Sequence, residues 1–216
     1  MFLLGGIIAW IILIIAITVH EFAHSYIADY LGDPTPKLMG RLTLNPLAHL
    51  DMIGTVLLPL LMILSGSNLL IGWAKPVQID SFNLRNPKKD SALISLAGPA
   101  SNLIFAAILS ILIQIPFIGL LDYLFIGLFI KLIQINVILA VFNLLPVHPL
   151  DGFKVVAGLL PQKLYRDWME LERYGMIILL FLIFPFFGSA PISKIISPVV
   201  NFILSLLIPV KTGGII

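Results

Sequence analysis

Long apolar runs dominate the chain, and only short polar segments separate them. The first run covers residues 2–19, and four others cover residues 92–117, 121–145, 175–187 and 195–210. A stretch of about 20 apolar residues is long enough to cross the hydrocarbon core of a bilayer as a helix. The pattern therefore predicts an all-α polytopic membrane protein with about five to six transmembrane helices.

One further apolar run, residues 52–64, decides the predicted topology. Its 13 residues are typical of a re-entrant segment, since such segments have roughly 10 to 14 residues. If the run re-enters, eleven of the thirteen Lys and Arg residues lie on one side of the membrane. If it crosses, nine lie on one side and three on the other. Basic residues accumulate in cytoplasmic loops, so we expect a re-entrant segment, an outer N-terminus and a cytoplasmic C-terminus.

The polar stretches are too short to form a separate domain. We expect one integral membrane domain over residues 1–216, with a core in about 1–154 and C-terminal helices in about 174–210. Partial alternation of apolar and polar residues predicts short membrane-associated strands at 37–44 and 76–84. The edge of such a strand could capture an extended polypeptide by strand addition.

Composition excludes several classes of protein. Hydrophobic residues make up 59% of the chain and charged residues 11%, against about 45–50% and 25% in soluble proteins. Thirteen basic residues and a net charge of +2 argue against nucleic acid as a partner. Because the chain has no cysteine, any metal must be held by His and carboxylate ligands. The partner that composition predicts is the lipid bilayer.

Two histidines and a glutamate follow directly on the first apolar run, at its polar end. His20 and His24 are four residues apart and share a helix face, so both imidazoles can reach one metal ion. Glu21 lies about 100° further around the helix, where it can accept a proton from water activated by zinc. Ionisable residues within a span are costly and usually mark a functional site. This pattern predicts one Zn²⁺ per chain.

A catalytic zinc needs a third protein ligand. The long run at residues 121–145 ends in a segment from Asn143 to Asp151 that holds two prolines and should unwind the helix. Unwound backbone is tolerated in a membrane where it lines a cavity. Either His148 or Asp151 could supply the ligand. For His49, a hydrogen bond to nearby backbone is at least as good an interpretation as a metal contact.

The chain resembles the site-2 protease family of intramembrane zinc metalloproteases, in its compact branch without accessory domains. Residues 20–24 carry the His-Glu-x-x-His motif, and residues 143–152 match the family pattern Asn-x-x-Pro-x-x-x-x-Asp-Gly. Residues 98–102, Gly-Pro-Ala-Ser-Asn, are also similar to the family, as are residues 44–51 and 72–77. The resemblance implies that His20, His24 and Asp151 bind zinc, that Glu21 is the general acid and base, and that Asn143 holds the substrate or stabilises the oxyanion.

The resemblance implies an endopeptidase that performs regulated intramembrane proteolysis. Its partner would be a membrane protein cut within or next to a transmembrane segment, in the cell membrane, at a site below the cytoplasmic surface. The alternative is a membrane transporter or metal-handling protein that uses a His/Glu/Asp ion pathway. Many transporters contain paired internal repeats, and none is visible in this sequence.

Three residues inside the predicted spans have packing roles in this interpretation. Asn102 and Asn136 are expected to hydrogen-bond between helices. Gly98, followed by a proline, is expected to let two helices approach closely.

Overall fold

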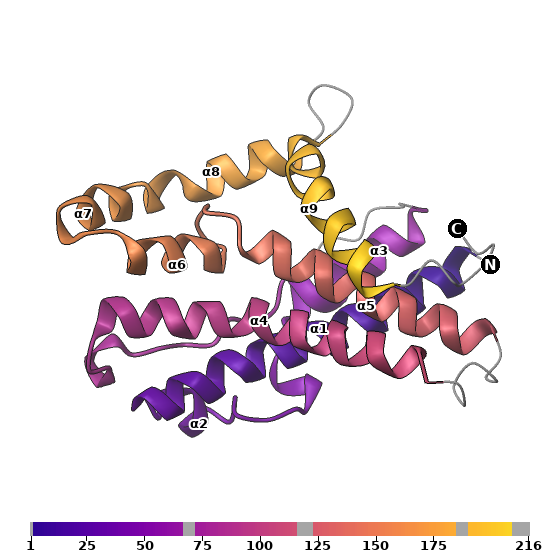
Figure 1. The fold of residues 1–216 in the computed structure, drawn as a ribbon, viewed down its shortest axis with the longest axis horizontal. Coiled ribbons are helices and arrows are strands. Elements are labelled where there is room, and N and C mark those ends of the chain that lie inside the picture. The colour runs from indigo at the N-terminus through magenta and orange to yellow at the C-terminus, as the bar shows by residue number, and fades with distance from the viewer. Residues whose placement is uncertain (1, 67–71, 116–122, 185–189, 209–216) are drawn as a thin grey trace.

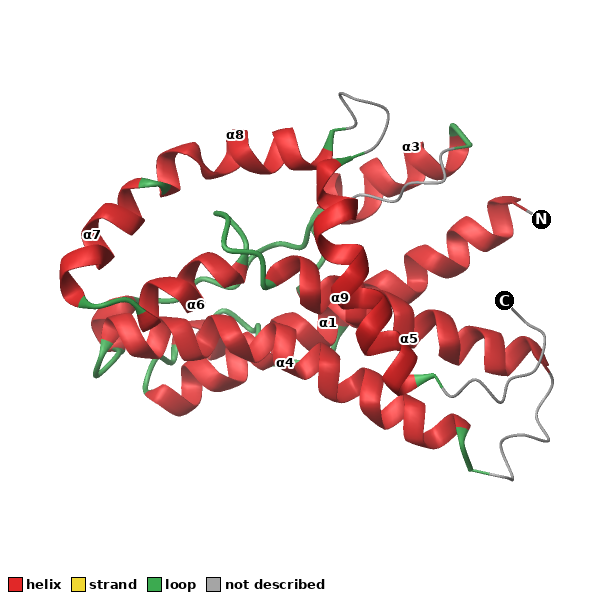
Figure 2. Ribbon diagram, turned by 45° about the horizontal axis from the view of Figure 1, so that its top comes forward, coloured by secondary structure: helices red, strands yellow, loops and turns green. Residues whose placement is uncertain are grey.

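The computed structural model describes residues 2–66, 72–115, 123–184 and 190–208, and these residues contain helices and loops but no strand (Figures 1 and 2). The helices are α1 (Phe2–Leu31), α2 (Thr35–Leu38), α3 (Leu58–Leu64), α4 (Pro87–Ile113), α5 (Tyr123–Asn143), α6 (Asp151–Leu159), α7 (Gln162–Glu170), α8 (Glu172–Ile183) and α9 (Pro191–Leu207). A π-helix, η2 (Met52–Leu57), and two 3₁₀ turns, η1 (Pro46–Ala48) and η3 (Ser81–Asn83), complete them. The predicted all-α class is confirmed.

Three of the described helices are long and apolar enough to cross a membrane, judged by length and composition. They are Leu3–Leu31, Pro87–Ile113 and Phe125–Asn143. Met52–Leu64 and Pro191–Leu207 are shorter apolar helices. The apolar runs predicted at 92–117, 121–145, 175–187 and 195–210 extend partly outside the described residues, and Lys211 of the charge count lies outside them. Re-entry of residues 52–64 stays a prediction.

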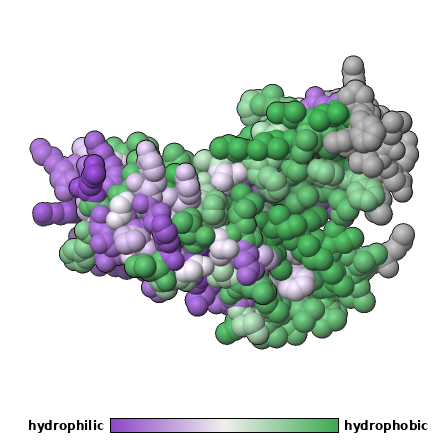
Figure 3. All heavy atoms as spheres, turned by 90° about the horizontal axis from the view of Figure 1, so that it is seen from below, coloured by the Kyte–Doolittle hydropathy of each residue, from purple (hydrophilic) through white to green (hydrophobic). Residues whose placement is uncertain are grey.

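The polar and apolar surfaces lie at opposite ends of the long axis (Figure 3). Hydrophilic residues gather at the end that holds α2, α6 and α7 in Figure 1, and hydrophobic residues cover most of the remainder. Such a division is expected of a helical bundle with one end in water and its flanks in lipid.

Helix α4 is the centre of the packing and contacts α1, α5 and α6. The core between α4 and α5 contains Ala106, Ile133 and Val137, all fully buried. A polar contact crosses the same interface, because the Asn102 side-chain amide donates to Asn136 Oδ1 at 2.7 Å. The predicted hydrogen bond between these two asparagines is therefore confirmed.

The two stretches predicted as strands take other forms. Helix α2 occupies the start of residues 37–44, and Gly40, with φ of +70°, then turns the chain. Residues 76–80 are extended but pair with no described strand, and the 3₁₀ turn η3 follows them. Turns and side-chain hydrogen bonds, rather than strand pairing, hold these two segments in position.

Candidate metal centre

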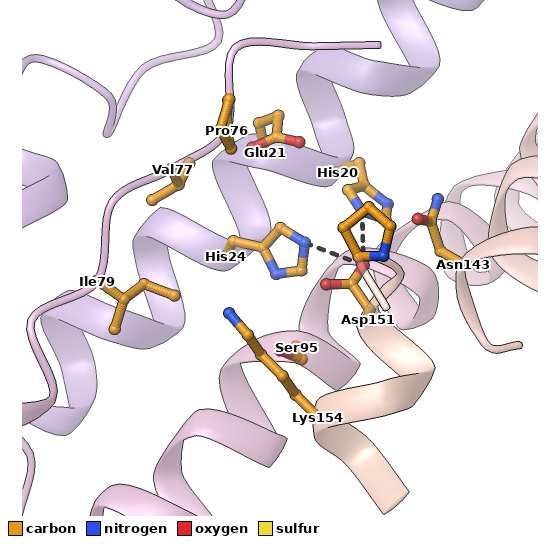
Figure 4. A pocket seen from close by; sticks show the side chains of 11 residues that line it. His20, Glu21, His24, Pro76, Val77, Ile79, Ser95, Asn143, Asp151 and Lys154 are labelled. Carbon is orange, nitrogen blue, oxygen red and sulfur yellow. Dashed lines mark hydrogen bonds and ion pairs between the residues drawn. The ribbon is translucent and has the colours of Figure 1, made fainter. Parts of the chain in front are cut away.

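Two neighbouring turns of α1 and the first residue of α6 bring three ligand groups to one point (Figure 4). His20 Nε2 lies 3.0 Å from Asp151 Oδ2, and His24 Nε2 lies 3.3 Å from the same oxygen. These residues form the group of three potential ligands found in the part of the chain that the structure describes, with all ligand atoms within 4.8 Å of one another. Both imidazoles are buried.

The far side of each imidazole is hydrogen-bonded, and this fixes which nitrogen faces Asp151. His24 Nδ1 lies 2.7 Å from the carbonyl oxygen of Ile94. A carbonyl only accepts, so Nδ1 carries the hydrogen and Nε2 keeps a free lone pair. His20 Nδ1 lies 2.6 Å from Asn102 Oδ1, which imposes the same tautomer on His20.

The orientation of the Asn102 amide is itself fixed by its other contacts. Its nitrogen donates to the carbonyl oxygen of Ala16 at 3.0 Å and to Asn136 Oδ1 at 2.7 Å. Asn136 in turn donates to the carbonyl oxygen of Leu132 at 2.8 Å. Because the nitrogen of Asn102 is used in this way, its oxygen must face His20. A chain of four groups thus holds one imidazole from behind.

This arrangement places two imidazole lone pairs opposite a carboxylate oxygen. Three acceptors facing one another repel unless a proton or a cation lies between them. Tetrahedral zinc with bonds of about 2.0–2.2 Å separates its ligand atoms by about 3.3–3.6 Å. The observed 3.3 Å matches this spacing, and 3.0 Å differs from it by a few tenths of an ångström. The donor set therefore fits zinc.

The loop between α5 and α6 positions Asp151. After Pro146 and Pro149, helix α6 begins at Asp151, in the first turn, where a carboxylate is favourable. A Cβ atom on the next residue, Gly152, would lie 2.2 Å from the carbonyl oxygen of Leu144. Only glycine lets the start of α6 pack on this loop, and this packing positions the neighbouring Asp151.

Gly98 of α4 faces the two histidines. A Cβ atom there would lie 2.5 Å from His24 Nε2 and 2.6 Å from His20 Nε2. The predicted close approach of two helices is confirmed, but the space that glycine leaves is next to the ligand atoms. Sequence reasoning missed this consequence. The available signal was the four-residue spacing to Asn102, which places both residues on one face of α4.

The other two histidines lie apart from this group. His148 Nδ1 is 3.6 Å from Glu172 Oε1 at the start of α8, and its ring contacts Phe153 edge to face. His49 Nε2 lies 2.8 Å from the carbonyl oxygen of Thr43, which is the backbone contact expected as one of its two interpretations. Of the two third-ligand candidates, the structure brings Asp151 to the site.

A cavity of about 170 Å³ opens in front of the three ligand groups. Glu21, Asn143 and Lys154 each line it from a different helix. The carbonyl oxygen of Leu139 accepts a 3.0 Å hydrogen bond from Asn143 Nδ2, and Figure 4 shows the Asn143 oxygen on the side of His20 and Asp151. The remaining lining residues are Pro76, Val77, Ile79, Ser95 and Pro149.

The extended segment 76–79 forms one wall of this cavity and is fixed by contacts just ahead of its start. Trp73 packs on Gly54, where a Cβ atom would lie 2.3 Å from the indole ring. Its carbonyl oxygen accepts a 2.6 Å hydrogen bond from Thr55, and the Lys75 N–H donates to the carbonyl oxygen of His49 at 3.0 Å. The π-helix η2 thus sets where the segment starts.

Asp33, just after α1, fixes the other end of the segment. This fully buried carboxylate accepts hydrogen bonds from the Asp80 N–H at 2.8 Å, from the Asn83 amide at 2.9 Å and from Thr35. Burial alone would raise the pKa of the Asp33 carboxyl, but these hydrogen bonds outweigh it and hold that pKa below its usual value. The carboxylate is therefore ionised when it holds the turn.

An all-helical membrane protein with this donor set fits the class of membrane-embedded zinc metalloproteases, and comparison with known proteins agrees. The model of Peptidase family M50 matches residues 113–184. "Putative zinc metalloprotease YwhC" of Bacillus subtilis is 40% identical over 185 residues, which cover 83% of this chain and 81% of that protein. Rip2 of Mycolicibacterium smegmatis, which has the same description, is 30% identical over 199 residues, covering 83% and 74%.

A zinc metalloprotease of Methanocaldococcus jannaschii is 23% identical over 208 residues, covering 88% of this chain and 50% of that protein. No solved structure matches the chain at a significant level. The identity and coverage of the Bacillus relative show that the chain belongs to peptidase family M50, the site-2 protease family. It is an intramembrane zinc metalloprotease, and nothing favours the alternative of a transporter.

Proposed function

We propose that His20, His24 and Asp151 hold the zinc ion, that Glu21 is the general acid and base, and that Asn143 binds the substrate. The observation that carries this proposal is the convergence of two imidazole lone pairs and one carboxylate oxygen at 3.0 and 3.3 Å. Glu21 and Asn143 line the cavity in front of that point.

Bound zinc would polarise the peptide carbonyl and lower the pKa of water to about 7. Glu21 accepts the proton of the attacking water and later returns it to the leaving nitrogen. Asn143 turns its carbonyl oxygen toward the site while its amide donates to Leu139 of its own helix. This orientation supports holding a substrate N–H, because the atom presented to the cavity is an acceptor.

The substrate in this proposal is a membrane protein cut within or beside a transmembrane segment. A helix uses its carbonyls in hydrogen bonds, so the segment must unwind before it is cut. Residues 76–79 offer an extended surface beside the cavity, with Val77 and Ile79 lining it. No main-chain hydrogen bond joins Val77 or Ile79 to another described residue. This supports capture of the unwound segment by strand addition.

We further propose a single membrane domain over residues 1–216, with its catalytic core in about 1–154 and C-terminal helices in about 174–210. Eighteen residues separate Phe2 from His20, or about 27 Å of helix, against a hydrocarbon core near 30 Å. This depth, the polar end of the molecule and the basic loops support a site just below the cytoplasmic surface of the cell membrane.

The test is Glu21→Gln in the full-length protein, purified in lipid nanodiscs with zinc. We expect one zinc per chain to remain, because Glu21 is outside the ligand group, and cleavage of a fluorescein-labelled casein probe to fall by at least about 100-fold. Glu170→Gln, on the exposed surface of α7, is the matched control and should retain activity.

Two outcomes would contradict the proposal. Normal cleavage by Glu21→Gln would remove the residue from the chemistry. Zinc flux into vesicles, with no cleavage by the unsubstituted protein, would instead indicate a metal transporter.

A further inference from the structure

One positively charged side chain lines the pocket, and the function proposed above gives it no role. Lys154 lies on α6, three residues after Asp151, and lines the cavity with its side chain exposed. Figure 4 shows it rising from α6 with its ammonium group toward His24, on the opposite side of His24 from Glu21. The helix therefore places a carboxylate ligand and an ammonium group at the same opening.

Two other lysines near this end of the molecule have partners. Lys37 pairs with Asp29 at 3.5 Å. Lys88 donates to the carbonyl oxygen of Leu160 and lies over the ring of Tyr165 at 5.2 Å. Within the described ranges, Lys154 has neither an ion pair nor a hydrogen bond to the protein. Its three N–H donors are free for a bound molecule.

The proposed reaction moves negative charge across this pocket. Water adds to the carbonyl carbon and its proton passes to the Glu21 carboxylate, while the π electron pair of the carbonyl moves onto the oxygen. Negative charge thus leaves Glu21 and develops on the substrate oxygen. When the C–N bond breaks, the oxygen regains its double bond and Glu21 returns the proton to nitrogen, which gives a carboxylic acid and an amine.

Asn143 is not placed to stabilise that charge as a donor. Its nitrogen is hydrogen-bonded to Leu139 O, and its oxygen faces the site. Among the cavity-lining side chains of the described residues, Lys154 is the cation, since the imidazoles have their Nδ1 hydrogens on Asn102 and Ile94. Donors aimed at charge that develops only in the transition state raise kcat and leave KM nearly unchanged.

We propose, as a step that rests on the function proposed above, that Lys154 is a catalytic residue that donates a hydrogen bond to the scissile carbonyl oxygen as it becomes negative. Lys154 acts as a hydrogen-bond donor and transfers no proton. Asn143 supplies an acceptor and Lys154 supplies a charged donor, so the two residues hold opposite polar groups of the same peptide bond.

The test compares Lys154→Met, Lys154→Gln and Lys154→Arg in the full-length protein with zinc in nanodiscs. With labelled casein, kcat of Lys154→Met should fall about 100-fold while KM changes by less than about twofold. A phosphinic peptide, whose tetrahedral anion imitates the charged oxygen, should bind Lys154→Met more weakly by a similar factor of about 100. Lys154→Arg should retain kcat within about tenfold, and zinc content should not change.

Lys163→Met is the matched control, because Lys163 is an exposed lysine of α7 outside the cavity. It should match the unsubstituted protein in kcat and in phosphinic-peptide affinity. If Lys154→Met fails to fold or to hold zinc, the charge requirement is tested by Lys154→Gln against Lys154→Arg, and equal kcat for these two would overturn the proposal.

Two further results would also overturn it. In one, kcat of zinc-loaded Lys154→Met stays within about threefold of normal; in the other, KM rises with kcat unchanged. Failure of the proposed function is distinguishable, because the unsubstituted protein would then not cleave casein, or Glu21→Gln would cleave it normally.

Discussion

The two sides of the cavity differ in how their hydrogen-bonding groups are used. The inner wall is defined by His20, His24 and Asp151; both of its imidazoles are buried and are supported from behind by Asn102 and the Ile94 carbonyl. The outer wall, defined by residues 76–79, is fixed before its start at Lys75 and after its end at Asp80. Between those anchors, no main-chain hydrogen bond joins the outer wall to another described residue.

This difference matches two tasks. Metal ligands must be held within a few tenths of an ångström, and a network in which every group is satisfied gives that rigidity. A substrate-binding edge must instead leave its own N–H and C=O groups available. If this comparison is right, changes behind the inner wall should alter zinc binding, and changes at the anchors of the outer wall should alter substrate binding.

The largest effect is expected for Gly98→Ala. Its methyl group would lie 2.5 Å from His24 Nε2, and neither the helix backbone nor the buried imidazole can move away cheaply. We expect zinc affinity to fall by at least about 100-fold, equivalent to about 3 kcal/mol of strain, with loss of cleavage. Zinc content after dialysis against a chelator series measures the affinity.

Gly127→Ala on α5 is the control for the glycine, since a Cβ atom there meets nothing within 4 Å. It should bind zinc normally, and circular dichroism should show full helix content for both variants. Normal zinc affinity in a folded Gly98→Ala protein would contradict the inner-wall geometry.

A smaller effect on the same wall is expected for Asn102→Ala. Loss of the 2.6 Å contact to His20 Nδ1 frees the imidazole to rotate and to change tautomer. Residues that orient a metal ligand typically contribute 10–100-fold to affinity, so we expect a fall of about 10- to 100-fold. Asn136→Ala is the comparison, because it removes the neighbouring hydrogen bond and leaves the His20 contact in place. Equal losses in the two variants would mean that helix packing, rather than ligand orientation, sets the affinity.

The inner wall could be predicted from sequence in part. Four-residue spacing placed His20 and His24 on one helix face, because helix geometry is local. Their hydrogen-bond partners, Ile94 and Asn102, are 70 and 82 positions away in the chain, and only packing brings these residues together. The resemblance to the site-2 protease family implied Asp151, whereas the residues alone left His148 open as an alternative ligand.

The outer wall was less predictable. Alternation at residues 76–84 predicted a strand, yet a strand needs a partner, and the described chain supplies none. At residues 37–44 the turn at Gly40 and the hydrogen bond from His49 to Thr43 override a weak alternating pattern. Anchoring of the outer wall by Asp33 depends on contacts 47 and 50 residues apart, which no local pattern contains.

The smallest effect is expected for Asp33→Asn, which loosens the outer wall and leaves the inner wall intact. An amide cannot accept all the hydrogen bonds that the carboxylate receives from Thr35, Asp80 and Asn83. We expect the free energy that holds residues 76–79 in their ordered conformation to fall by about 1 kcal/mol. KM for labelled casein should then rise by about three- to tenfold, with kcat and zinc content unchanged. Asp29→Asn, which removes only the partly exposed pair with Lys37, should leave KM unchanged.

The same carboxylate predicts a dependence of stability on pH. Because the folded protein holds the pKa of Asp33 below its usual value, the ionised group stabilises the fold at any pH above the ordinary value near 4. That stabilisation is lost as pH falls through the lowered folded-state pKa. Thermal unfolding midpoints of the unsubstituted protein and Asp33→Asn should therefore differ at pH 7 and begin to converge as the pH falls below about 4. A difference that persists unchanged at low pH would show that the carboxylate's charge is not what anchors the outer wall.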